Sequence, residues 1–169
     1  MHVKSLLAET AIAIEEFDPR SVVKVALEVM KTIEQPRRRK VLQNLIDHAE
    51  AEASGDYDAL MASCSRQGQS YAVYGTQMES PTTGQPSNYA ELEVHYRMLI
   101  ELNLYLIHFA AEKLTVGEDE VWIEGIVHML IRGAMARDIY SVDIDEPDAV
   151  YMLSRRTVVA FIFDDEGLS

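Results

Sequence analysis

The sequence predicts an α+β protein in which helices come first and long antiparallel strands follow. Between Val41 and Ala53 the apolar residues recur at helical spacing. From Leu104 to Arg132, and again from Ala149 to Phe163, aliphatic and aromatic residues dominate, a composition typical of strands. A helical first part and a strand-rich last part therefore define the fold class.

The first 35 residues are expected to form two helices. Residues 3–17 and 21–35 both place apolar residues at helical spacing, and Ser21 is an acceptable N-cap for the second. We therefore expect an N-terminal helical extension over residues 1–35, followed by a single domain over residues 36–169. A lid, a dimerisation arm and a plain packing element are all open roles for the extension.

A basic cluster, Arg37 to Lys40, stands at the start of the next helix in a chain whose formal charge is −13. It could bind an anion or an acidic partner. A solvated helix start that pairs with nearby carboxylates is the simpler interpretation, because charge runs usually lie on solvated faces.

The middle of the chain alternates helices with irregular segments. Ser54-Gly55-Asp56 predicts the end of one helix and the cap of the next, which runs from Tyr57 to about Cys64. Residues 69–75 are a short strand candidate, and residues 80–87 are a loop that could cover a pocket mouth. The last residue of that loop, a serine, is expected to cap a helix over residues 88–102.

The segment from Leu104 to Arg132 predicts a β-hairpin that turns at Val-Gly-Glu-Asp. On its second arm the odd-numbered residues are wholly apolar, so we interpret that face as the pocket side. Glu124 and His128 then belong to the outer face, where a dimer partner or water would satisfy them. The last strand, residues 149–163, alternates little, so we expect it to be covered on both faces.

The hairpin also holds a possible metal site: His108, Glu112, Glu124 and His128. Strand geometry argues against it, because residues four apart along a strand are separated by roughly 13 Å. Zinc or iron ligands must approach one ion to about 2.0–2.2 Å, so the four side chains cannot share one centre. We predict neither a metal nor another cofactor.

Composition limits the partners and the compartment. The charge of −13 argues against nucleic acid and an anionic membrane surface, since both reward clustered Lys and Arg. The only cysteine, Cys64, excludes an internal disulfide and fits a reducing cytosol. No apolar run approaches the roughly 18 residues of a membrane span, and the N-terminus is unlike a secretion signal. We expect a cytoplasmic protein.

The order of elements and three short motifs resemble the nuclear transport factor 2-like superfamily, which includes ketosteroid isomerase, scytalone dehydratase and SnoaL-like polyketide cyclases. The motifs are SGDYDALM at 54–61, TVGEDEVWIEG at 115–125 and AFIFDDEG at 160–167, within a similarity that covers roughly residues 37–167. The resemblance implies a curved antiparallel sheet wrapped around helices into a cone, a mostly apolar pocket at its open end and dimerisation through the sheet's outer face. Such motifs support a fold better than a function.

The sequence departs from the family pattern in two ways. In the family another strand follows the turn at residues 165–167, where this sequence ends; either the chain is truncated or the N-terminal helices cover what that strand would cover. The carboxylates of ketosteroid isomerases are missing as well. Their positions fall at Val73 or Tyr74 and near Val159, and the acid of the polyketide cyclases also falls near Val159.

Scytalone dehydratase is a closer partial match. It carries a His-Phe pair on its first long strand, and His108-Phe109 sits comparably; its helix carboxylate would fall at Ala53, with Glu52 next door. The steroid isomerases place an oxyanion-hole tyrosine where this chain has His48. A satisfied structural histidine is the simpler interpretation of His48.

These resemblances lead us to expect a cofactor-independent lyase or isomerase acting on a small apolar, oxygenated substrate. His48 and His108 would serve as acid and base within about 8 Å of each other, with Tyr74 as a hydrogen-bond donor. The residues expected to line the substrate are Tyr96, Tyr105, Phe109, Met129, Arg155 and Thr157. The alternative is a non-catalytic ligand-binding or dimerisation module. The expected partners are a small-molecule ligand and a second copy of the chain at the outer sheet face, with no nucleic acid and no membrane.

Overall fold

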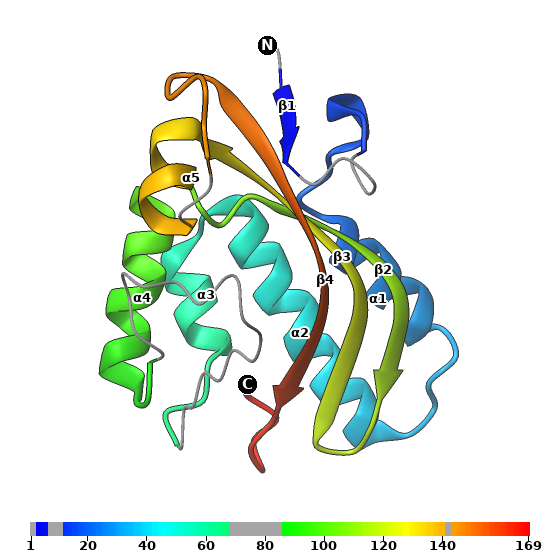
Figure 1. Cartoon of the computed structure of the whole chain (residues 1–169). Helices are drawn as coiled ribbons and strands as arrows, with labels where there is room; N and C mark the ends of the chain where they lie inside the picture. Colours follow the sequence, from blue (N-terminus) through cyan, green and yellow to red (C-terminus); the bar gives the residue numbers. More distant parts are fainter. Residues whose placement is uncertain (1–2, 7–11, 68–85, 141–142) are drawn as a thin grey trace.

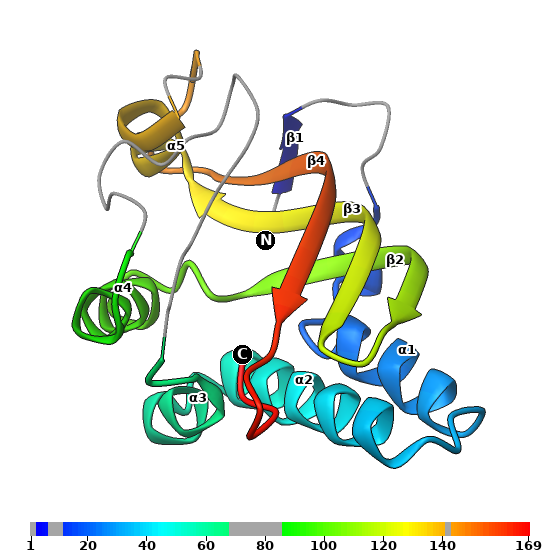
Figure 2. The same cartoon turned by 90° about the horizontal axis from the view of Figure 1, so that it is seen from below.

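The computed structural model describes residues 3–6, 12–67, 86–140 and 143–169, and over these residues the fold is α+β (Figure 1). Its α-helices are α1 (Ser21–Met30), α2 (Pro36–Ser54), α3 (Tyr57–Ser63), α4 (Tyr89–Glu101) and α5 (Gly133–Tyr140). Its strands are β1 (Val3–Leu6), β2 (Ile107–Val116), β3 (Glu120–Arg132) and β4 (Val150–Ile162). A curved, open sheet wraps around helices, as predicted, and α2 runs along its concave side (Figures 1 and 2).

The sheet has the strand order β1-β4-β3-β2, and the predicted hairpin of β2 and β3 is confirmed. β3 pairs antiparallel with both β2 and β4, whereas β1 pairs parallel with the start of β4. A register shift follows Ala111 opposite Gly125. A Cβ atom at Gly125 would lie 2.2 Å from the carbonyl oxygen of Ala110, so this irregularity needs a glycine.

The main core lies between the concave face of the sheet and the helices α1 and α2. The odd-numbered residues of β3 face this core, as their alternation predicted, and Val121 and Ile123 are almost fully buried. Leu42 and Leu45 meet them from α2. Burial of this apolar surface is the main stabilising term.

Both ends of α2 follow the local sequence. Pro36 occupies the first turn, where its missing N–H leaves no bond unmade. Gly55 ends the helix in the left-handed conformation with φ 68°, and Asp56 caps α3 by accepting a hydrogen bond from the Ala59 N–H at 3.1 Å. The predicted corner between the two helices is confirmed.

The prediction of a helix over residues 3–17 is wrong. Residues 3–6 form β1, and a single 3₁₀ turn covers residues 14–16. β1 takes the edge of β4 at Val150–Leu153. A short isolated helix is marginally stable, so pairing with an open strand edge can override helical spacing in the sequence.

The expectation that Ser21 caps α1 is wrong, because Ser21 is the first residue of the helix and Arg20 holds the N-cap position. The Ser21 hydroxyl instead accepts a hydrogen bond from the Phe109 N–H of β2 at 2.8 Å. α1 adds Val23 and Ala26 to the main core. α1 therefore shares its core with the rest of the fold. The domain boundary at residue 35 stays a prediction.

Two further expectations need correction. The cap of α4 is Asn88, which accepts from the Glu91 N–H at 3.0 Å, while Ser87 donates to the Glu91 carboxylate. β4 is covered on both faces only over residues 151–154; beyond them exposed residues alternate with half-buried ones. The strand candidate at 69–75 lies outside the described residues.

Candidate functional site

The direction of His108 is set by alternation along β2. Phe109 is 4% exposed and packs in the main core below α1 and α2, so the adjacent His108 lies on the outer face. There it stands directly opposite His128, with the two ring centroids 5.5 Å apart. The expectation that His108 and His48 share a cavity is therefore wrong, because the sheet separates them. Phe109 is a core residue.

Within the outer-face pair, His108 contacts the N-terminal segment and His128 bonds to β4. The Asp18 N–H donates to His108 Nδ1 at 3.0 Å, and the Phe17 ring centroid lies 6.0 Å from that of His108. His128 is 1% exposed and its Nδ1 lies 2.8 Å from Ser154 Oγ. Burial lowers the pKa of both histidines. The predicted outer-face position of Glu124 and His128 is confirmed, but a serine satisfies His128.

His48 lies inside the molecule, where α2 meets α3, α4 and β4. Its Nδ1 is 2.9 Å from Ser63 Oγ and its Nε2 is 3.2 Å from the Tyr96 hydroxyl. The Ser63 hydroxyl donates to the Leu60 carbonyl at 2.6 Å, so its oxygen accepts from Nδ1–H. Nε2 is then the acceptor for Tyr96. The Phe161 ring stands edge-on at 5.7 Å.

His48 is therefore a neutral histidine with both ring nitrogens bonded. Burial lowers its pKa to about 4, and the two hydrogen bonds tie α2 to α3 and α4. The simpler interpretation of His48, a satisfied structural histidine, agrees with this geometry. The structure does bring His48 and Tyr96 together.

A carboxyl group stands one helical turn beyond His48 on the same face of α2. It belongs to Glu52, and burial raises its pKa to about 7. The charge of Glu52 also affects the Cys64 thiol. Burial, and to a lesser degree the negative charge of Glu52, raises the pKa of Cys64 to about 11. Among the described residues, none gives the Glu52 carboxyl a hydrogen-bond donor or a cation. The sequence pointed to Glu52 in one way: the residue stands next to Ala53, where the helix carboxylate of scytalone dehydratase would fall.

Of the remaining substrate-lining candidates, three lie half-buried on the concave face of the sheet and one packs against the corner after α2. Arg155 and Thr157 pair with Val127 and Gly125 of β3 and share the concave face with them, half-buried. Met129 is half-buried on that face too. By contrast, the Tyr105 ring packs on Gly55, where an added Cβ would lie 3.1 Å from it. Tyr74 lies outside the described residues.

In the described part of the chain, no three His, Cys, Asp or Glu side chains converge on a possible metal position. None of the helices in residues 12–67, 86–140 or 143–169 has the length and apolarity of a membrane span.

The sequence matches no protein family model and no curated protein. Among solved structures, the chain is similar to a candidate SnoaL-like polyketide cyclase from Shewanella putrefaciens, with a TM-score of 0.56, 11% identity, and coverage of 94% of this chain and 84% of that one. A second such protein, from Shewanella denitrificans, gives a TM-score of 0.54 and 14% identity over 79% of this chain and 84% of that one. Identity this low bears on the fold alone.

Proposed function

We propose that this chain, which has the nuclear transport factor 2-like fold, is a cofactor-independent lyase or isomerase acting on a small oxygenated molecule, with Glu52 as its acid/base group. The observation that carries the proposal is the position of Glu52: a half-buried carboxyl whose pKa is raised by burial, one turn from His48, without a donor or cation among the described residues. It replaces the histidine pair expected from the sequence.

The setting of Glu52 suits proton transfer. A carboxyl that is desolvated and unpaired lowers stability when it ionises, and such unfavourable groups are typical of functional sites. With a pKa of about 7, Glu52 is present both as carboxylate and as acid near neutral pH. That is the condition in which one group can take a proton and return it.

The chemistry can be written with Glu52 alone as the proton carrier. Its carboxylate removes a proton from the carbon next to a carbonyl, and the carbonyl oxygen takes the negative charge. The protonated carboxyl then gives the proton to another carbon, which is isomerisation, or to a departing hydroxyl that leaves as water, which is dehydration. Arg155 and Thr157 are our candidates for holding the substrate oxygen, because both are half-buried on the concave face.

The test uses small ketones as probes, since proton removal can be followed without knowing the natural substrate. In D₂O, proton NMR reports the replacement of the proton next to the carbonyl by deuterium. We expect the protein to accelerate this exchange with a midpoint near pH 7, and Glu52→Gln to reduce it by about 10²-fold or more. The matched control is Glu93→Gln, an exposed carboxyl on α4. Exchange that is absent, or equally fast in Glu52→Gln, contradicts the proposal.

An exposed apolar strip on the outer face favours a second candidate, a dimerisation module. Trp122, Val158 and Ile162 are 47%, 58% and 63% exposed, and Ala160 lies opposite Trp122 on the same face. Contiguous apolar surface of this kind marks interaction sites, and a second copy of the chain is the occupant we propose. Light scattering should find a dimer that Val158→Lys converts to a monomer. Val94→Lys, at a 69% exposed position on α4, should leave it intact; a monomeric parent protein contradicts this candidate.

A further inference from the structure

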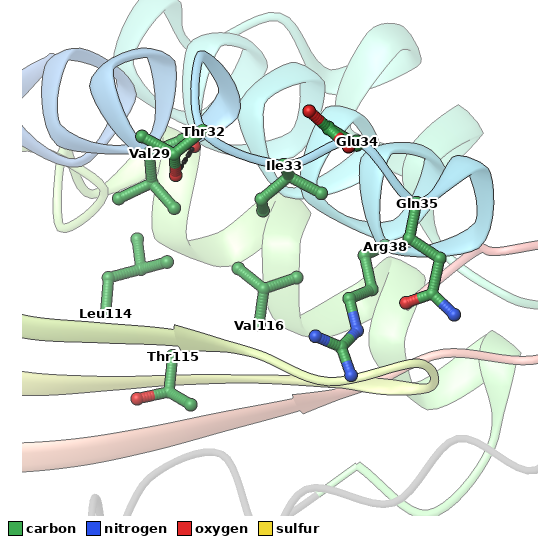
Figure 3. A pocket seen from close by; sticks show the side chains of 9 residues that line it. All are labelled: Val29, Thr32, Ile33, Glu34, Gln35, Arg38, Leu114, Thr115 and Val116. Carbon is green, nitrogen blue, oxygen red and sulfur yellow. Dashed lines mark hydrogen bonds between the residues drawn. The ribbon is translucent and has the colours of Figure 1, made fainter.

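A hollow of about 340 Å³ lies between the end of α1, the turn that follows it, and the last residues of β2 (Figure 3). Val29 and Ile33 point toward Leu114 and Val116 across it, and Thr115 points away. The four apolar side chains are only partly buried and pack against the main core. The hollow is therefore an apolar recess that remains open to the surface.

The wall of this hollow is fixed by the basic cluster at the start of α2. Arg39 donates to the carbonyls of Met30 and Ile33, which holds the turn after α1 in place. Arg37 forms an ion pair with Asp119. The expected pairing with a nearby carboxylate is therefore confirmed for Arg37, whereas Arg39 bonds backbone carbonyls instead.

Arg38 differs from its two neighbours. Its exposed side chain extends beside Val116 (Figure 3), and among the described residues nothing forms an ion pair or hydrogen bond with it. Its guanidinium stays positively charged at any physiological pH. It offers a planar fork of donors that matches a carboxylate.

The other polar groups around the hollow are engaged or turned away. The Thr32 hydroxyl donates to the Val29 carbonyl at 2.9 Å, and the Gln35 amide donates to the Glu118 carboxylate at 2.9 Å. Glu34 points away from Leu114 (Figure 3). A ligand in the hollow would therefore meet an apolar wall and a single cation.

We propose that this hollow is a binding site for a small amphipathic carboxylate. The hydrocarbon part packs against Val29, Ile33, Leu114 and Val116, and the carboxylate pairs with Arg38. The volume falls at the lower end of the roughly 300–1,000 Å³ range of small-molecule sites. The site is separate from Glu52, so it does not depend on the proposed catalytic function.

Octanoate is the probe, titrated into protein with ¹³C-labelled methyl groups and followed by NMR. We expect saturable shifts of the Val29, Ile33, Leu114 and Val116 methyl groups. Arg38→Gln should weaken binding about tenfold, the equivalent of one charge-assisted hydrogen-bonded pair. Lys31→Gln is the matched control, because Lys31 is exposed and pairs with Glu28 outside the hollow, and it should leave the affinity unchanged.

Octanol provides a second arm, with the same hydrocarbon tail and no charge. It should bind more weakly than octanoate and with the same affinity to the parent protein and to Arg38→Gln. Octanoate shifts that do not saturate, that centre on Met129 of the concave face, or that persist unchanged in Arg38→Gln would overturn the proposal. Because Arg38 is exposed, its replacement leaves the core intact.

Discussion

His48 and His128 are both buried, and each has its Nδ1 hydrogen-bonded to a serine hydroxyl, yet they lie on opposite sides of the sheet. His48 is enclosed by α2, α3, α4 and β4, and its second nitrogen accepts from Tyr96. The His128 ring stands edge-on to that of His108 on the outer face. At His108 a short N-terminal segment contributes a backbone N–H from Asp18 and the Phe17 ring.

The difference shows that burial of a histidine is a poor guide to chemistry. At both sites a hydrogen bond offsets the loss of water around the ring, so the rings serve packing first. Among the described residues, the Glu52 carboxyl, on the same face of α2 as His48, is a titratable group without such compensation. An unpaired group beside a fully paired one is the pattern expected where binding or catalysis completes the site.

Replacing His48 by leucine should have the largest effect. The substitution keeps the side-chain volume roughly constant but removes the two internal hydrogen bonds that the His48 ring makes with Ser63 and Tyr96. We expect the free energy of unfolding to fall by about 3 kcal/mol. Urea unfolding followed by Trp122 fluorescence and circular dichroism measures it.

The matched variant at the other site is His108→Leu. Its ring is half-buried, and the Asp18 N–H that it binds can turn to water when the acceptor is lost. We expect a loss of about 1 kcal/mol. Equal losses at His48 and His108 would mean that the N-terminal segment encloses its histidines as firmly as the helices enclose His48, and the comparison would fail.

On the concave side of the sheet, the sequence predicted the main secondary-structure features. Alternation along β3 gave its buried face, and Gly55 with Asp56 gave the corner after α2, because each signal acts within a few residues. The fold could be predicted although the sequence is only 11–14% identical to the solved structures. The reason is that strand alternation and helix capping depend on neighbouring residues alone.

The sequence could not predict interactions that depend on distant partners. β1 forms because the start of β4 has an open edge, and the inward direction of Phe109, hence the outward direction of His108, depends on which side α1 and α2 cover. The raised pKa of Glu52 follows from its burial in the folded chain. None of these has a signature in a short stretch of sequence.

The pH dependence of stability separates Glu52 from His48, because the two groups act in opposite directions. The pKa of Glu52 is raised from its usual value near 4.5 to about 7, so the folded state holds a proton there that the unfolded state has released, and stability is lost as the pH rises through that window. The pKa of His48 is lowered from 6.5 to about 4, so stability is lost as the pH falls through that range. Between about pH 4.5 and 6.5 the two effects offset each other.

Glu52→Gln should therefore raise the free energy of unfolding at pH 8 by about 2 kcal/mol, a value reduced from the full shift because part of the side chain reaches the surface. The gain should vanish by pH 4, where Glu52 is protonated in both states. In the variant the stability should also fall more steeply below pH 6.5, since His48 then acts unopposed. Urea unfolding from pH 4 to pH 8, with Glu93→Gln as the exposed control, measures both features. A gain that is the same at every pH would show that Glu52 is not a desolvated acid, and the contrast with His48 would lose its basis.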